Sequence, residues 1–462
     1  MQAPLKDADR RFVWHPYTQM REWEKLDDSR VVVVKGEGFF LVDGEGRRYL
    51  DGTASMWCNV WGHGQNEVTR AMQDQLGRIP HSTLFGLASE QSALLAEKLV
   101  SITASASGRS KNRLDRVFYT DNGSSAIESA LKMALQYWRN VGRPEKTRFV
   151  SLENGYHGDT AGAMSVGYIE QFFSAYKPML MMKNVHRVPS PLLHGSRFAG
   201  GPDGEQDLVE WCLDRTERTL KKVGKKCAAL VMESGAQIAG GAVIYPKGYQ
   251  QKVSRLCREH DVLLILDEIA TGFGRLGNMV EYAAQKSRPD IVCFGKALTA
   301  GYFPLAVTMA RRQVFDAFLG KYSENRHFYH GHTFTGHPVG CAAALANLEL
   351  YEKRNLMQQI NANAQYLESR LAEFKEISIV ADIRHRGLLA GIELERGGKP
   401  LLYLKNKERL GQFVARESLK MGVHLRPLGN VLLVIPPLAI DRESLGRMVD
   451  CYLELARKAE KL

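Results

Sequence analysis

Two stretches of the sequence decide the fold: LLILDEIATGFGR at residues 263–275 and IVCFGKALTAGYFP at residues 291–304. Each begins with a short apolar run that gives way to polar and glycine-rich sequence. Such runs predict strands that are buried in a parallel sheet. A parallel sheet presents its chemistry at the carboxyl ends of its strands. Asp267 ends the first run and Lys296 follows the second, so we expect both side chains at one edge of the sheet.

The acid and the lysine together predict a cofactor. A lysine can form a Schiff base with an aldehyde, and a carboxylate can hold a protonated pyridine nitrogen. An enzyme that uses pyridoxal 5'-phosphate (PLP) must supply both groups. Either residue alone would be typical of a solvated loop. The pair within one unit of strand, connection and strand favours Lys296 and Asp267 as catalytic residues that bind PLP.

The same region contains a second pattern with a different meaning. Gly272, Gly274 and Gly277 spell G-x-G-x-x-G, which is the fingerprint of dinucleotide-binding sites. That fingerprint should follow its strand directly and open a helix, with an acidic residue about twenty positions later at the end of the next strand. Here DEIAT intervenes, and Asp290 precedes the next strand. The pattern therefore does not favour a nucleotide site.

The segment FYTDNGSSAIESALKMALQYW, residues 118–138, predicts a site for an anion. Apolar residues recur at helical spacing after Ser124 and predict an amphipathic helix. These are Ile127, Leu131, Ala134, Leu135 and Trp138. Free N–H groups and the positive end of the helix dipole favour an anion at the start of such a helix. One Ser or Asn there would be an ordinary N-cap, whereas Gly123, Ser124 and Ser125 together favour a phosphate cradle.

The order of these motifs resembles that of the class III aminotransferases, which have the type I fold of PLP enzymes. The sequences of the individual motifs most resemble those of the biotin-pathway branch of that family. The segments that carry the resemblance span nearly the whole chain. They are VWHPYTQM (13–20), DNGSSAIESALKMALQYW (121–138), ENGYHGDTAGAMSV (153–166), LDEIATGFGR (266–275), FGKALTAG (294–301), YHGHTFTG (329–336) and HLRPLGNVLLVIPPL (424–438).

The resemblance implies an α/β architecture with a large PLP-binding domain around a mainly parallel sheet and a smaller α+β domain. It places the large domain at residues 76–340. Residues 1–75 and 341–462 would build the small domain together. Within the first of these segments, residues 38–52 alternate in polarity around the turn DGEG, which predicts a hairpin.

Further cofactor contacts follow from the resemblance. Tyr156 matches the aromatic residue that stacks on the pyridine ring, and Glu233 matches the acid of a Glu-Pro segment near the cofactor. This chain has Ser234 in place of that proline, which puts the local shape of the loop in doubt. Thr333 matches a residue that contacts the PLP phosphate from the partner subunit. A homodimer with composite sites is therefore expected.

The resemblance also implies the substrate. Arg426 matches the residue that binds a substrate carboxylate, and a guanidinium can take both oxygens at once. Tyr17, Trp57, Tyr156 and Gly331 match residues that line the substrate channel. An eight-carbon chain between carboxylate and ketone needs an apolar wall of this kind. The implied reaction is conversion of 8-amino-7-oxononanoate into 7,8-diaminononanoate in biotin biosynthesis.

The amino donor is the point at which this sequence departs from the better-known branch. Members that use S-adenosylmethionine carry paired tryptophans and a His-Gly-Pro-Thr segment. This chain has Met56 before Trp57, and His332 within HGHT. We therefore expect L-lysine as donor, with S-adenosylmethionine as the alternative. An omega-amine or diamine transaminase that uses pyruvate, and a PLP-dependent mutase or racemase, also stay open.

Histidines crowd the segment that precedes residue 338, but they do not predict a metal site. They are His327, His330, His332 and His337. Their spacing matches neither a Cys/His motif nor a helical H-E-x-x-H, and ligands of a metal need fixed partners. We therefore expect no metal. His157, beside Tyr156, is interpreted as a packing residue.

Composition is typical of a cytoplasmic enzyme. The chain has 462 residues, of which 44% are hydrophobic, so it can bury a large core. No apolar stretch approaches the length that spans a membrane, and the start MQAPLKDADRR has no apolar signal region. Seven scattered cysteines without a C-x-x-C motif predict reduced, mostly buried thiols.

The net charge of +11 raises the possibility of a nucleic-acid-binding protein. Such a protein would gather its basic residues on one face, with aromatic stacking partners. Here they are dispersed, and the dense patches are GRSKNR at 108–113 and KKVGKK at 221–226, which are interpreted as solvated loops. We expect no nucleic-acid partner.

Overall fold

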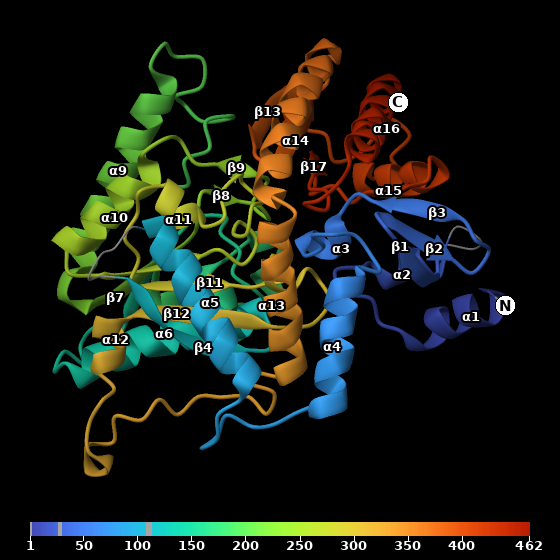
Figure 1. Ribbon diagram of the computed structural model, residues 1–462. Coiled ribbons are helices and arrows are strands. Elements are labelled where there is room, and N and C mark those ends of the chain that lie inside the picture. The colour runs from blue at the N-terminus through green and yellow to red at the C-terminus, as the bar shows by residue number, and fades with distance from the viewer. Residues whose placement is uncertain (1, 26–29, 108–112) are drawn as a thin grey trace.

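A seven-stranded sheet forms the centre of the computed structural model, which describes residues 2–25, 30–107 and 113–462 (Figure 1). The strand order from one edge to the other is β4-β12-β11-β10-β7-β5-β6. Their bounds in that order are Leu114–Thr120, Ala306–Arg311, Ile291–Phe294, Leu263–Asp267, Cys227–Glu233, Arg148–Leu152 and Val185–Val188. Only β12 runs antiparallel to its neighbours β4 and β11. The predicted mainly parallel α/β sheet is confirmed.

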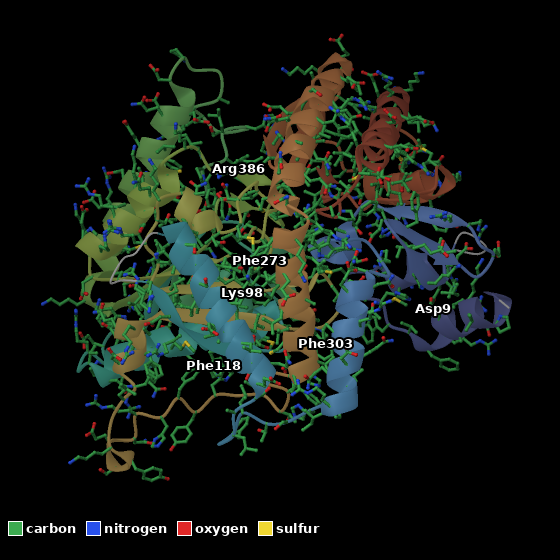
Figure 2. All side chains as sticks on the ribbon, viewed as in Figure 1. Asp9, Lys98, Phe118, Phe273, Phe303 and Arg386 are labelled. Atoms are coloured by element: carbon green, nitrogen blue, oxygen red, sulfur yellow. The ribbon has the colours of Figure 1, made fainter. Side chains whose placement is uncertain are left out.

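Helices cover both faces of this sheet, because its strands are apolar on both sides. In β10, Leu263 and Ile265 pack in one core cluster, whereas Leu264 and Leu266 pack in another. Helix α6 (Gly123–Asn140) covers the first face. The second face is covered by α5 (Glu90–Ser107), α9 (Gly204–Val223), α10 (Tyr249–Glu259) and α13 (Pro338–Lys353). An ion pair of 2.5 Å between Lys98 and Glu352 joins α5 to α13, and Lys98 is labelled in Figure 2.

The predicted hairpin of residues 38–52 is present. Strands β2 (Phe40–Asp43) and β3 (Arg48–Asp51) pair antiparallel, and β1 (Val33–Glu37) lies on the far side of β2. Asp43 shapes the turn, because its Oδ1 accepts the N–H groups of Glu45 and Arg47. On its other side β3 pairs with β16 (Val423–His424), which comes from the C-terminal part of the chain.

The C-terminal region forms an α+β layer of its own, drawn in orange and red in Figure 1. Its sheet contains β13 (Val380–Arg386), β14 (Leu389–Arg396), β15 (Lys399–Pro400) and β17 (Val431–Val434). Its helices are α14 (Leu356–Leu371), α15 (Leu410–Lys420) and α16 (Arg442–Lys461). The pairing of β3 with β16 joins the two ends of the chain, and α13 runs across residue 340. The division at residues 75 and 340 stays a prediction.

Shorter elements connect these layers. The helices are α1 (Gln2–Phe12), α2 (Met20–Glu24), α3 (Ala54–Trp57), α4 (Asn66–Arg78), α7 (Ala161–Val166), α8 (Glu170–Phe173), α11 (Glu281–Ala284) and α12 (Arg312–Asp316). A two-stranded ribbon consists of β8 (Ala236–Gln237) and β9 (Val243–Ile244). The 3-10 helices are η1 (Ser174–Met179), η2 (Met182–Asn184), η3 (Gly224–Lys226), η4 (Lys296–Thr299), η5 (Tyr322–Glu324) and η6 (Ala372–Glu376).

Three expectations about the surface and the thiols can be compared with this fold. All seven cysteines are free, and six of them are buried, as predicted. Residues 221–226 are not a loop: they form the end of α9 and the whole of η3. Of the other basic patch, residues 108–112 lie outside the described residues. None of the helices in the described ranges is long and apolar enough to cross a membrane.

Candidate active site

Three acidic or basic side chains meet at the carboxyl edge of the central sheet. Asp267 ends β10, and its register partner Glu233 ends the neighbouring strand β7. Side chains alternate along a strand, so both carboxylates face the α6 side of the sheet, like Ile265 two residues earlier. Lys296 follows β11 on the other side of β10. The expected placement of Asp267 and Lys296 at one edge is confirmed.

These side chains open into a cavity of about 630 Å³. Seven of the residues that the sequence nominates line it: Trp57, Gly123, Ser124, Tyr156, Glu233, Asp267 and Lys296. The wall also contains Asp159, Ile269, Thr299 and Phe303, which sequence reasoning did not nominate. Phe303 is labelled in Figure 2, beside α13 and α4. The cavity therefore brings together distant parts of the chain, from Trp57 to Leu305.

Asp267 is held rigidly from two sides. Its Oδ2 lies 2.8 Å from Nδ1 of His157, and both side chains are buried. Its Oδ1 accepts the N–H of Ile269 at 2.9 Å. The interpretation of His157 as a packing residue is therefore wrong: it is the hydrogen-bond partner of the buried carboxylate. The sequence shows His157 next to Tyr156, which was predicted to bind the cofactor. The neighbouring residues do not indicate that its hydrogen-bond partner lies 110 positions away.

Glu233 holds the backbone of two neighbouring segments in place. Its two oxygens accept the N–H groups of Tyr156 at 3.2 Å and Ile238 at 3.0 Å. Burial raises the pKa of Glu233 to about 7, with His157 opposing the rise and Asp267 adding to it. The neighbouring Ser234 donates its N–H to the carbonyl oxygen of Asp267 at 2.9 Å, a bond that a proline could not make. The departure at Ser234 thus adds a bond between β7 and β10.

Lys296 has a strained backbone conformation and lies close to the Trp57 ring. Its backbone is left-handed, with φ of 45°, which is rare for a residue with a side chain. Its Nζ lies 5.0 Å from the centroid of the Trp57 ring. Burial lowers the pKa of Lys296, whereas Asp267 and Glu233 oppose that change. A lowered pKa leaves more of the amine neutral, which is the form that attacks an aldehyde.

Trp57 reaches Lys296 through an unusual turn. All four residues of α3, Ala54–Trp57, have positive φ, between 47° and 74°. Left-handed turns cost roughly 1–2 kcal/mol per residue, so other bonds must hold this one. The buried Asp51 supplies them: it accepts the N–H and the hydroxyl of Ser55 at 3.0 and 2.6 Å. His63 lies 3.2 Å from the same carboxylate.

The start of α6 is built to hold an anion. Helix α6 begins at Gly123, and Asn122 caps it by accepting the N–H of Ser125. The N–H groups of Gly123 and Ser124 have no acceptor among the residues that the structure describes. The backbone at Gly158 also approaches Ser124 closely, because a Cβ at Gly158 would lie 2.5 Å from the Ser124 side chain. This end of the cavity fits the phosphate of PLP.

The opposite rim contains the nominated substrate residues. Tyr17 and Tyr156 both donate a hydroxyl to Oδ1 of Asp159, at 2.6 and 3.1 Å. Arg426 donates to the carbonyl oxygen of Tyr17 at 3.2 Å. Neither Tyr17 nor Arg426 lines the cavity itself, and both are exposed. The structure therefore brings Tyr17, Tyr156 and Arg426 into one chain of contacts at the rim.

Two nominated residues lie apart from this cavity. Thr333 and Gly331 are both exposed, and neither lines the cavity of this chain. Gly331 faces the ring of Phe85. Between them, Nδ1 of His332 lies 3.7 Å from Asp121, which does line the cavity. The segment therefore passes near the site without entering it within one chain.

The histidine-rich segment forms no metal-binding group among the described residues. In those ranges the group with suitable spacing consists of His194, Glu393 and Glu395, which does not line the cavity. The ring of His330 lies 5.1 Å from that of His332, and its Nδ1 lies 3.1 Å from Nζ of Lys132. An ammonium group so close to a ring nitrogen disfavours a cation there.

Comparisons with known proteins agree with this geometry. The family model described as Aminotransferase class-III matches residues 24–454. The adenosylmethionine-8-amino-7-oxononanoate aminotransferase of Geobacter sulfurreducens is 44% identical to this chain over 96% of each protein. The crystal structure of the protein of that name from Methanocaldococcus jannaschii superposes with a TM-score of 0.89, at 37% identity and 99% coverage of both chains.

A solved omega transaminase is equally similar in shape but less so in sequence. The Pseudomonas jessenii enzyme in complex with PMP has a TM-score of 0.90 at 28% identity, and covers 99% of this chain and 98% of its own. Shape alone therefore does not separate the branches of the family. The family model nevertheless covers most of the chain, and the cavity has the lysine, the acid and the anion cradle that PLP requires. This chain belongs to the class-III aminotransferases, and is a PLP-dependent enzyme.

Proposed function

We propose that this enzyme converts 8-amino-7-oxononanoate into 7,8-diaminononanoate, a step of biotin biosynthesis, with S-adenosylmethionine as the amino donor. The observation that supports this most is the graded similarity of its relatives. The Geobacter sulfurreducens and Methanocaldococcus jannaschii proteins named for this reaction are 44% and 37% identical to the chain, against 28% for the omega transaminase. The resemblance also runs through WHPYTQM and YHGDT, which resemble the biotin-pathway branch more than the class at large.

Lys296 and Asp267 carry the chemistry in this proposal. Bound PLP would supply the carbonyl that receives the amine and the ring that accepts electrons from the substrate carbon. Nζ of Lys296 would hold the cofactor covalently and would move a proton at the substrate carbon that bears the amine. The carboxylate of Asp267, oriented by His157, would offer an anion to a protonated ring nitrogen. Tyr156 would stack on the ring.

The remaining cofactor contacts divide between two subunits in this proposal. Gly123 and Ser124 would donate N–H groups to the phosphate, because these groups lack acceptors within the described chain. In a homodimer, Thr333 would contact the same phosphate from the second subunit, and Gly331 would line that subunit's neighbouring substrate channel. The exposure of both residues, and their absence from this chain's own cavity, support that arrangement.

Substrate recognition is assigned to the rim. The guanidinium of Arg426 binds the substrate carboxylate, with Tyr17 and Trp57 along the apolar chain. The contact between Arg426 and the Tyr17 carbonyl oxygen supports this reading, because it holds the two residues together. One guanidinium nitrogen is used in that bond, which leaves the others available for a carboxylate.

The expectation that L-lysine is the donor is not supported by the comparisons, because the most similar relatives named above carry adenosylmethionine in their names. The structure also weakens its basis. Met56, which stands for the first tryptophan of the pair, is 52% exposed and does not line the cavity. Lysine stays the second candidate, because His332 stands where members that use S-adenosylmethionine have a proline. His332 also lies beside Asp121, which lines the cavity.

The test is a donor comparison with the purified PLP-loaded enzyme. The enzyme is mixed with 8-amino-7-oxononanoate and with one donor at a time: S-adenosylmethionine, L-lysine or putrescine. Mass spectrometry then measures 7,8-diaminononanoate. Product with S-adenosylmethionine supports the proposal. Product with lysine but not with S-adenosylmethionine would make lysine the donor. If no donor gives product, but the enzyme transfers an amine from putrescine to pyruvate, it belongs to the diamine branch.

A further inference from the structure

A second cavity, of about 680 Å³, lies at the opposite edge of the central sheet. Its wall contains Leu114 at the start of β4 and Arg311 at the end of the antiparallel strand β12. Helix α10 and helix α11 close it from the side, at the left of the molecule in Figure 1. Asp267 and Lys296 stand at the other ends of β10 and β11, so the two cavities are separate.

The wall of this cavity is strongly basic. Among the described residues that line it, none is acidic. Seven of them carry a positive charge: Arg113, Lys252, Arg255, Arg258, Lys286, Arg288 and Arg311. Arg255 pairs with Glu259 at 2.7 Å, and Arg311 pairs with Asp290 at 3.1 Å. The other five have no ion-pair partner among the described residues. So many unpaired cations around one hollow repel each other unless an anion lies between them.

Two polar atoms of the cavity lining lack a partner among the residues that the structure describes. The hydroxyl of Ser287 and Nε of Arg311 are buried and form no hydrogen bond with any of those residues. Their residues are only 7% and 8% exposed. An unsatisfied buried donor costs about 1–3 kcal/mol, so such groups are rare unless a ligand or water satisfies them. Both atoms can donate a hydrogen bond, and both residues line the cavity.

We propose that this basic cavity binds a small, multiply charged phosphate compound. A carboxylate presents two oxygens, whereas a diphosphate presents several acceptors that can meet the arginine forks and the Ser287 hydroxyl at once. The volume suits a small molecule rather than a macromolecular surface. In this arrangement Arg258 and Arg288 bind from the exposed rim, and Ser287 and Arg311 bind from the floor.

The charge state of the floor agrees with this proposal. Burial lowers the pKa of Arg311; Asp290 opposes that change, and the nearby Arg258 and Arg288 add to it. Burial raises the pKa of Asp290, with Arg311 and Arg258 opposing the rise. Asp290 is already engaged, because its oxygens accept Arg311 and the N–H of Leu264. Two engaged carboxylates, Asp290 and Glu259, therefore stand against seven cations, and an anionic ligand would relieve the remaining repulsion.

Isothermal titration of the PLP-loaded enzyme with inorganic pyrophosphate tests this proposal. The cofactor fills the active-site cradle, so binding reports a second site. We expect one site per chain. The double variant Arg258→Gln/Arg288→Gln should raise Kd about tenfold or more, because charge-assisted bonds are lost. Ser287→Ala should raise it severalfold without any change in net charge.

A matched control separates the site from general attraction. Lys222→Gln/Lys225→Gln removes two charges from exposed lysines outside the cavity and should leave Kd unchanged. The proposal is overturned by absence of a second site in the native protein, by equal weakening in the control, or by an unchanged Kd in both cavity variants. Binding of citrate as tightly as pyrophosphate would overturn the assignment to phosphate. None of these outcomes depends on which amino donor the active site accepts.

Discussion

Asp267 and its neighbour Glu268 follow one another in the sequence, yet they have opposite roles in the structure. Asp267 faces the cavity, whereas Glu268 faces the other side of the sheet and accepts the N–H group of Glu281 at 2.9 Å. Burial raises the pKa of Glu268 to about 8. Strand alternation decides which carboxylate can reach a cofactor. This difference could be predicted from the sequence. Asp267 follows Leu263 and Ile265 by an even number of residues, so the three side chains point to the same face of the sheet.

The variant Asp267→Asn tests the role of the charge. The amide keeps the size of the side chain and can still bond to His157, but it removes the anion. We expect PLP to remain bound and turnover to fall about a hundred- to a thousandfold, as for the loss of other preorganised electrostatic groups. Cofactor absorbance and steady-state rates with the same donor measure the two quantities. Turnover within a few-fold of the native value would remove Asp267 from the mechanism.

The burial of Lys296 makes a prediction about stability. Its pKa is lowered from the ordinary value of 10.5, so folding disfavours the charged amine. The stability contribution of such a group is lost as pH falls through the lowered pKa, and is regained as pH rises toward 10.5. In the cofactor-free protein, Lys296→Met should therefore raise Tm at pH 7, and the difference should shrink as pH rises. A difference that is constant across pH would show that the amine is not destabilised by burial.

Among the elements, α3 is the least predictable from sequence. ASMWCNVWG has no glycine before residue 62, so nothing local indicates four consecutive left-handed residues at 54–57. The turn exists because Asp51 holds it through Ser55. Burial opposes ionisation of Asp51, but hydrogen bonds from His63 and Ser55 outweigh it and lower the pKa. By contrast, helix α6 and strands β10 and β11 were predictable, because each has its own periodicity or apolar run.

Weakening the anchor of α3 should change the substrate side of the active site. Asp51→Asn keeps the shape but replaces a charged acceptor, and should cost about 1–3 kcal/mol in the free energy of unfolding. Because Trp57 would lose its fixed position, we expect KM for 8-amino-7-oxononanoate to rise more than Kd for PLP. Urea unfolding and steady-state kinetics check both, and Ser55→Ala should give a smaller effect in the same direction. An unchanged KM in a destabilised protein would make Asp51 structural only.

At the scale of the whole molecule, the two edges of one sheet carry different chemistry. The carboxyl edge of the parallel strands contains the active site, as the pattern of residues 263–304 indicated. The basic cavity at the other edge was not predicted, because its cations come from α10, from the segment after α11 and from the ends of β4 and β12. None of these short segments is unusual alone. The pairing of β3 with β16, and the contact of His157 with Asp267, escaped local reasoning for the same reason.

The proposed mechanism depends on Lys296 as the residue that binds PLP covalently. Borohydride reduction of the native, PLP-loaded enzyme fixes the cofactor to its lysine, and peptide mass mapping then locates the modified residue. We expect one phosphopyridoxyl group per chain, on the peptide that contains Lys296, and none on Lys296→Met treated in the same way. Modification of another lysine in the native enzyme, or equal labelling of the variant, would contradict it.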